Sequence, residues 1–166
     1  VGHILAALYS TDLINLIYQP FIAFHLSGGT TEALLVKPDD TEIIKANIIS
    51  KSLDLKAGQA IDRAGVMLGL QFPCGKQLDK LSQNSNKSYK VRPSMIGADC
   101  SLSGIENKTK AMIESNQAPC DVANFVLTCI TNAVDKMIEN IVSDYGNLPI
   151  VFSGGVSSNT MLRNVI

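Results

Sequence analysis

The chain has 166 residues, of which 46% are hydrophobic and 17% are charged, and 14 basic against 15 acidic residues give a net charge of −1. This length and composition fit one folded domain with a substantial core and exclude a disordered segment. The balanced charge excludes a uniformly basic nucleic-acid-binding domain. It does not exclude a local basic patch: Lys87, Lys90 and Arg92 lie together in a polar stretch, although such a run is usually a solvated loop.

The first part of the chain predicts a helix followed by strands. Apolar residues at helical spacing indicate a helix over residues 2–18 that breaks near Ser10 or Thr11. Three antiparallel strands are expected next, over 21–26, 30–36 and 41–47. The expected buried face of the helix consists of four leucines, Leu5, Leu8, Leu13 and Leu16.

The middle of the chain is predicted to be helical. Apolar spacing indicates a helix over residues 53–68, which Gly69 ends, and a second helix is expected over 76–81. Residues 82–92 are polar and rich in turn formers, which is typical of a mobile loop.

A long helix dominates the last third of the sequence. A short strand or turn at 99–104 is expected to lead into a helix over 104–115. The clearest helical stripe covers 121–143, with Asp121 as the expected N-cap. A strand over 149–152 and a helix over 156–163 follow.

The four cysteines, at positions 74, 100, 120 and 129, form no C-x-x-C pair. With no signal peptide or membrane-length apolar run visible, we expect reduced, mostly buried thiols in a cytoplasmic protein that makes no membrane contact. The chain starts at Val1, and its last helical pattern is cut at Ile166, which predicts a piece of a longer protein.

The tripeptide Ser-Gly-Gly occurs twice, at residues 27–29 and 153–155, each time after a short apolar run. Glycine pairs at a turn let backbone N–H groups approach a ligand closely, and such groups favour anions. Either copy alone is an ordinary turn, but two such turns on one sheet could hold the two ends of a nucleotide.

The order of elements predicts the fold class. Three strands, a helical insertion at about 52–118, a long helix, a strand and a helix are typical of an α/β protein with a mixed sheet. We interpret residues 1–166 as one ribonuclease-H-like lobe of the actin, Hsp70 and sugar-kinase (ASKHA) fold. In that fold ATP lies between two such lobes.

Five segments together resemble the family of tRNA threonylcarbamoyladenosine synthases, formerly described as O-sialoglycoprotein endopeptidases or glycoproteases. The segments are LSGGTTE at 26–32, KAGQAIDR at 56–63, LGLQFPCG at 68–75, SLSG at 101–104 and SGGVSSNTMLR at 153–163. The resemblance implies transfer of a threonylcarbamoyl group from its adenylate to adenosine-37 of tRNA. It does not support a protease, because the chain has only two histidines and no H-E-x-x-H motif.

The resemblance also implies a nucleotide site. Asp62 matches an acidic residue for the ribose hydroxyls, Gly75 a glycine beside the nucleoside, and Asn159 an amide that contacts the ligand. The expected ligand is ATP or threonylcarbamoyl-adenylate, and the catalytic residues stay unknown. The glycine turn that wraps the phosphates corresponds to His25, Leu26, Ser27, Gly28 and Gly29.

The chain departs from the family pattern at the metal site. The family holds one divalent metal, iron or zinc, with an H-x-x-x-H pair on a helix and a later Asp. His3 matches the first histidine, but Ala7 stands at the second, and the Asp lies beyond Ile166. We therefore expect a divergent member whose metal centre is altered. Thr30 replaces a family histidine, Gln59 a glutamate and Glu106 a lysine.

Three functions are compatible with these residues. The first is the tRNA-modifying transferase, with tRNA and the family's protein partners. The second is a non-catalytic nucleotide-binding or assembly subunit that forms a homodimer or pairs with an ASKHA paralogue. The third is an ATP-dependent kinase of the same superfamily, because fold does not determine function.

Overall fold

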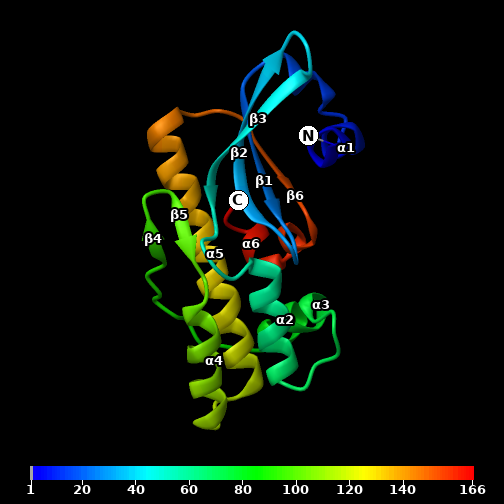
Figure 1. Cartoon of the computed structure of the whole chain (residues 1–166). Helices are drawn as coiled ribbons and strands as arrows, with labels where there is room; N and C mark the ends of the chain where they lie inside the picture. The colour runs from blue at the N-terminus through cyan, green and yellow to red at the C-terminus, as the bar shows by residue number, and fades with distance from the viewer. Residues whose placement is uncertain (1) are drawn as a thin grey trace.

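The computed structural model describes residues 2–166 and is built around a four-stranded mixed sheet in the order β3-β2-β1-β6 (Figure 1). β1 pairs with β2 antiparallel and with β6 parallel, so the first and last strands of the chain are neighbours. The bounds of the strands are Phe21–Leu26 for β1, Thr31–Asp39 for β2, Ile43–Lys51 for β3 and Ile150–Ser153 for β6.

Alternate residues of β1 point to opposite faces of the sheet, and a helix packs on each face. Phe21 and Ala23 pack with Ile4 and Leu8 of α1 (Gly2–Ser10). On the other face, the core contains Phe24 and the buried stripe of α5 (Pro119–Tyr145). The sheet is therefore the middle layer between a short helix and a long one.

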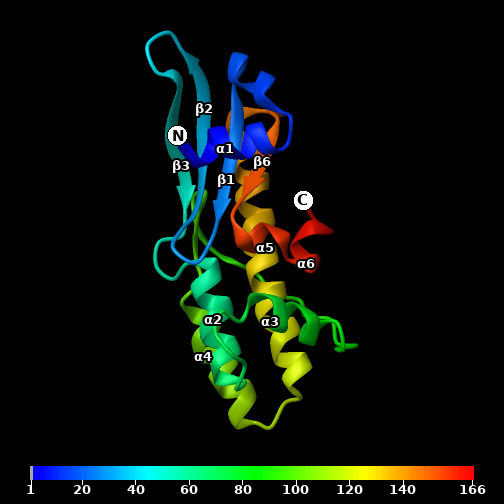
Figure 2. The ribbon, with the colours of Figure 1, turned by 90° about the vertical axis from the view of Figure 1, so that its right-hand side faces the viewer.

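The remaining helices surround the half of α5 that projects beyond the sheet, as Figure 2 shows. A small hairpin of β4 (Ser94–Ile96) and β5 (Asp99–Ser101) lies beside them, and Ser52 forms an isolated bridge with Cys100. These helices are α2 (Ala57–Met67), α3 (Gly75–Ser82), α4 (Gly104–Glu114) and the short α6 (Thr160–Arg163).

The predicted helix 2–18 is two pieces. α1 ends at Ser10, and a 3₁₀ helix, η1 (Ile14–Tyr18), follows. The hydroxyl groups of Ser10 and Thr11 both donate to the Ala7 carbonyl, and Asp12 has a φ of 60°, so the chain turns here as expected. The prediction of Leu13 as a core residue was wrong, because Leu13 lies after this turn and is 46% exposed.

The second hairpin is longer than predicted. Asp39 was expected in the turn but ends β2, and its Oδ1 accepts hydrogen bonds from the N–H groups of Thr41 and Glu42. With this Asx-type turn, the loop between β2 and β3 lies later in the sequence than predicted. β3 begins at Ile43 and extends to Lys51.

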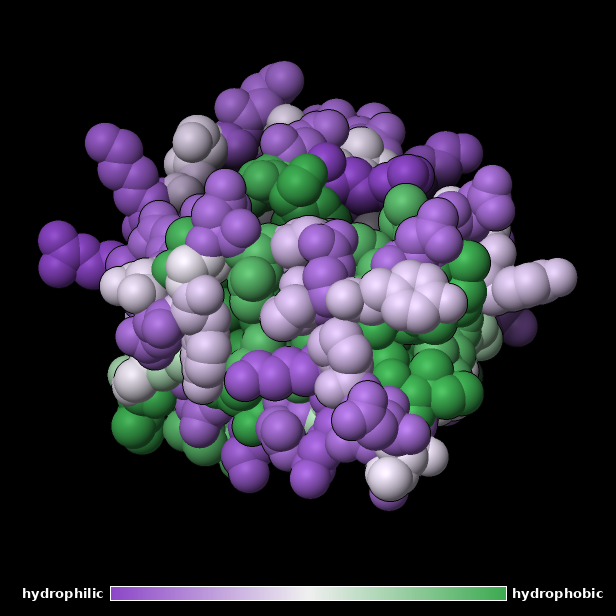
Figure 3. All heavy atoms as spheres, turned by 90° about the horizontal axis from the view of Figure 1, so that it is seen from above, coloured by the Kyte–Doolittle hydropathy of each residue, from purple (hydrophilic) through white to green (hydrophobic). Residues whose placement is uncertain are grey.

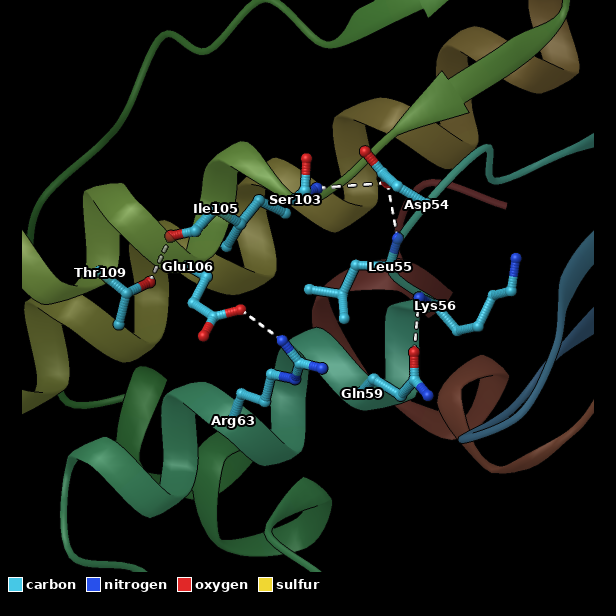
Figure 4. Close-up of polar contacts among 9 residues, drawn as sticks. All are labelled: Asp54, Leu55, Lys56, Gln59, Arg63, Ser103, Ile105, Glu106 and Thr109. Carbon is cyan, nitrogen blue, oxygen red and sulfur yellow. Dashed lines mark hydrogen bonds and ion pairs between the residues drawn. The ribbon is translucent and has the colours of Figure 1, made fainter.

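The predicted helix over 53–68 begins four residues later, at Ala57. The Asp54 carboxylate accepts from the Leu55 N–H, which holds the preceding residues outside the helix. The Gln59 side chain accepts from the Lys56 N–H and caps the true start (Figure 4).

Asp121 is not the N-cap of the long helix, as the sequence had indicated. α5 begins at Pro119 with Ala118 before it, so Asp121 lies inside the first turn. Its carboxylate instead binds Lys87 at 2.8 Å and Ser85 at 2.6 Å. It thus anchors the polar segment 83–93, which forms no helix or strand.

The thiols agree with the prediction from the sequence. Cys74, Cys100 and Cys129 are buried, Cys120 is half-buried, and all four are free. Within residues 2–166, no helix is both long enough and apolar enough to cross a bilayer.

Candidate nucleotide site

The two glycine turns lie side by side at one end of the sheet. β1 and β6 run parallel with His25 opposite Ser153, and each strand ends at its Ser-Gly-Gly sequence. His25 Nδ1 and Ser153 Oγ are 2.9 Å apart, although the two residues are 128 positions apart in sequence. The carboxyl ends of adjacent parallel strands are the usual place for a ligand in α/β sheets.

The first turn presents two unpaired backbone donors. Ser27 N–H donates to the Thr30 carbonyl, and Thr30 N–H donates to Ser27 Oγ, which closes the turn. Gly28 and Gly29 are exposed, and within residues 2–166 neither N–H has a protein acceptor. Two successive free N–H groups in a turn form a small anion-binding surface.

Close packing fixes this turn on both sides. A Cβ on Gly58 would lie 2.6 Å from Gly28 Cα, and a Cβ on Gly154 would lie 2.3 Å from the Leu26 carbonyl oxygen. Gly58 also donates its N–H to the Ser27 carbonyl. The first turn is therefore held between α2 and the second turn. The sequence did not single out Gly58, because a lone glycine in a predicted helix does not indicate which backbone segment packs against it.

Asp62 lies one helical turn after Gly58 on α2 and holds the start of α3. Its Oδ1 accepts the Cys74 N–H at 2.8 Å, so one of the two oxygens expected to meet ribose already has a protein donor. Gly75 follows as the first residue of α3, and a Cβ there would meet nothing within 4 Å. The space beside Gly75 is open.

Asn159 is 8% exposed, and its Oδ1 caps α6 by accepting from the N–H groups of Met161 and Leu162. Only its Nδ2 can face a ligand. Asp79 of α3 accepts from both the N–H and the hydroxyl of Thr160. Asp79 therefore links α3, which begins at Gly75, to α6, which Asn159 caps. The sequence did not reveal this contact between distant residues.

The entire chain, residues 1–166, matches the family described as tRNA N6-adenosine threonylcarbamoyltransferase. The chain belongs to this family.

Individual members confirm the match over nearly the full chain. The transferase of Riemerella anatipestifer is 31% identical over 176 residues, covering 99% of this chain and 50% of that protein. The transferase of Thermosipho africanus is 32% identical over 171 residues, covering 98% of this chain and 50% of that protein. The chain thus spans about half the length of these family members.

A solved structure confirms the fold prediction. Component A of (R)-2-hydroxyglutaryl-CoA dehydratase from Acidaminococcus fermentans superposes with a TM-score of 0.54 and 14% identity, covering 96% of this chain and 55% of that one. At this identity the likeness concerns the fold alone, which is the actin-like ATPase fold with a mixed sheet.

The two family departures on α2 and α4 line one cavity of about 500 Å³ beside Asp62. Glu106 forms a 2.6 Å ion pair with Arg63, and Gln59 is used in the α2 cap (Figure 4). The acidic residue that replaces the family lysine is thus neutralised within the chain, so the exchange leaves no unpaired charge there.

The two histidines of the chain lie against each other. His3 and His25 stack with ring centroids 5.5 Å apart and an interplanar angle of 15°, and Ala7 is half-buried one turn after His3. Among residues 2–166, no three His, Cys, Asp or Glu side chains gather to hold a metal ion. His3 stays a predicted ligand only.

The buried groups near the site have structural roles. The Leu26 side chain is fully buried, so of this predicted site residue only the backbone can face a ligand. Burial, helped by the charge of Asp62, raises the pKa of the Cys74 thiol, and burial raises the pKa of Cys100 and of Cys129 to about 11. These thiols are protonated at neutral pH and are poor nucleophiles.

Proposed function

We propose that the protein carrying this chain transfers a threonylcarbamoyl group to N6 of an adenosine in tRNA. In this proposal, residues 1–166 form the lobe that binds the nucleotide end of the donor, threonylcarbamoyl-adenylate, and the same site accepts ATP as a nucleotide ligand. The observation that carries the proposal is the pair of free N–H groups at Gly28 and Gly29, beside a second glycine turn.

Each remaining site residue has a part in this proposal. The Gly28 and Gly29 N–H groups bind a phosphate oxygen, because aligned backbone donors favour anions. The Asp62 oxygen that does not bind Cys74 accepts from a ribose hydroxyl. The open space at Gly75 admits the nucleoside, and Asn159 Nδ2 donates to it.

The chemistry is an acyl transfer. The N6 nitrogen attacks the carbamoyl carbon, the bond from that carbon to the phosphate oxygen breaks, AMP leaves, and N6 loses one proton. Backbone donors at the phosphate stabilise the charge on the leaving group without having to reorganise. The residues of this lobe bind and orient the donor.

The rest of the protein completes the cleft in this proposal. The matched relatives are about twice as long as this chain, which leaves room for a second lobe of similar size. We propose that this lobe forms the opposite wall, that tRNA and the family's partner proteins bind the assembled molecule, and that the protein is cytoplasmic.

Isothermal titration of the full-length protein with ATP tests the nucleotide site. Gly75→Ala should leave thermal unfolding unchanged, because its Cβ enters open space, yet weaken ATP binding by about tenfold or more by filling the nucleoside's approach. Asp62→Asn keeps an acceptor for Cys74 and should weaken binding as well. Asp144→Ala, at the far end of α5, is the control.

Unchanged ATP affinity in both variants would refute the site. Titration with and without a divalent metal distinguishes the transferase from the non-catalytic nucleotide-binding subunit. Binding that needs no metal, without transferase activity, would indicate a nucleotide-binding subunit, which the presence of Ala7 and the stacked histidines favours.

A further inference from the structure

The segment between α3 and α4 carries cations that the proposed nucleotide site does not use. Residues 80–112 contain six lysine or arginine residues and two acidic ones, in a chain that has 14 basic and 15 acidic residues in all. A concentration of positive charge on one region attracts polyanions even when the net charge of the molecule is near zero.

Two neighbouring cavities lie along this segment and share Lys108. The larger, of about 480 Å³, is lined by Lys87 and Tyr89 of the segment and by residues of α4 and α5. The smaller, of about 90 Å³, is lined by Arg92 and residues that follow it, together with α4 and α5. Lys108 lines both cavities and lies where they adjoin, and we call the two together the Lys108 groove.

The floor of the Lys108 groove is apolar and aromatic. Tyr89 and Phe125 meet edge to face with ring centroids 5.4 Å apart, and Met112 lies beside them. Tyr89 is half-buried, so part of its surface is open to a ligand. Aromatic surfaces of this kind accept unstacked nucleobases whatever their sequence.

The rim of the groove is positively charged. Lys87 is paired with Asp121 at 2.8 Å. Arg92 and Lys108 are exposed, and neither has an ion-pair partner within the part of the chain that the structure describes. The two side chains are therefore free to meet phosphate groups, which supply most of the affinity of proteins for nucleic acids.

We propose that the Lys108 groove binds a single-stranded stretch of the RNA substrate, with a base against Tyr89 and Phe125 and phosphates beside Arg92 and Lys108. The inference rests on the proposed function, which makes tRNA the substrate. A neutral apolar peptide would leave the two cations unused, and a free phosphate would leave the aromatic floor unused.

Fluorescence anisotropy of the full-length protein with labelled, unmodified tRNA tests this proposal. The double substitution Arg92→Glu/Lys108→Glu should weaken binding by about tenfold or more at low salt, since two phosphate contacts become repulsive. The matched control is Lys37→Glu/Lys45→Glu, which makes the same charge change on exposed residues of the β2–β3 hairpin. It should change the affinity by less than about twofold.

Two further measurements distinguish the contribution of the cations to tRNA affinity from that of the aromatic floor. Arg92→Ala/Lys108→Ala should lower the slope of log affinity against log salt by about 1 to 2, as expected for two lost contacts. Tyr89→Leu should weaken binding while Tyr89→Phe, which keeps the ring, should not. Thermal unfolding and ATP titration of each variant check that fold and nucleotide site are intact.

The outcomes distinguish this inference from the proposed function. If the wild-type protein does not bind tRNA, the proposed function fails. If the wild type binds and the groove variants bind equally well, the groove inference is overturned and the function stands. Unchanged tRNA affinity with loss of a protein partner would assign the groove to that partner instead.

Discussion

At the scale of single residues, the glycines of this lobe divide into two kinds. Gly28, Gly29, Gly75 and Gly155 have open space where a Cβ would lie, whereas Gly58 and Gly154 face backbone atoms closer than 3 Å. Open glycines leave room for something outside the chain, and closed ones let two parts of the chain approach. The sequence gives no means of separating the two kinds.

Gly154 and Gly155 make this division testable, because they are adjacent. Gly154→Ala should lower the free energy of unfolding by about 2–4 kcal/mol, since Gly154 has a φ of 92° and its Cβ would collide with the Leu26 carbonyl. Gly155→Ala should change it by less than about 0.5 kcal/mol. Urea denaturation of both variants measures the difference, and equal values would contradict the close approach.

Asp54 accepts hydrogen bonds from two segments that are far apart in the sequence. Its carboxylate accepts from the N–H groups of Leu55 and Ser103, as Figure 4 shows, and so ties the start of α2 to the start of α4. It also accepts from the Leu102 N–H and from Ser101 Oγ. Burial opposes ionisation, but hydrogen bonds from Ser101, Ser103 and the backbone outweigh it and hold the pKa of Asp54 well below its usual range.

Because the pKa of Asp54 is lowered in the folded state, its ionised form stabilises the fold. The stabilisation from ionised Asp54 is present above the ordinary carboxyl pKa of about 4 and is lost as the pH falls below it. Asp54→Asn should therefore destabilise the lobe at pH 7 by about 1–2 kcal/mol and by less near pH 3. Thermal unfolding of both proteins across this pH range checks the trend, and a constant difference would contradict it.

The buried hydroxyl of Tyr89 has no hydrogen-bond partner among residues 2–166. Burying such a group unpaired is unfavourable, so Tyr89→Phe should raise the free energy of unfolding by about 1 kcal/mol. Tyr145→Phe is the control, since Tyr145 is 42% exposed and loses nothing on substitution. A lower stability of Tyr89→Phe would indicate an unseen partner, such as a bound water.

At the scale of elements, the β2–β3 turn stores strain at Ile43. This β-branched residue has a φ of 68° and is 60% exposed, so its side chain gains little from packing. Ile43→Asn should stabilise the protein by about 1 kcal/mol, because asparagine tolerates this conformation. Ile48→Asn, at an exposed position of β3 where the φ is not positive, should not stabilise. Calorimetry distinguishes the two.

The elements that could be predicted are those with local signals. The glycine turns and the apolar stripe of α5 depend on neighbouring residues, and the structure contains them. The contacts between elements were beyond prediction, because Asp79 meets Thr160 across 81 positions and Gly58 meets Gly28 without any sequence signal. The prediction of Asp121 as an N-cap was wrong for the same reason, since its partner Lys87 belongs to a distant segment.

At the scale of the whole molecule, one end of the sheet presents apolar surface. Viewed from above, hydrophobic residues lie exposed between polar ones (Figure 3). The exposed hydrophobic residues of η1 and β3 include Ile14, Ile43 and Ile48. Surface of this kind fits a lobe that contacts other parts of a larger protein, in keeping with relatives of twice this length.

The pairing of β1 with β6 has a consequence for how the molecule forms. The antiparallel strands β1, β2 and β3 are consecutive in sequence, but β6 joins them only when a loop of more than a hundred residues closes, which is slow and entropically unfavourable. During synthesis β6 also leaves the ribosome after all the other strands. Pulse-labelled hydrogen exchange should thus find protection in β1–β3 before β6. The two glycine turns would then meet last, so that a nucleotide bound by both would recognise only chains that have finished folding.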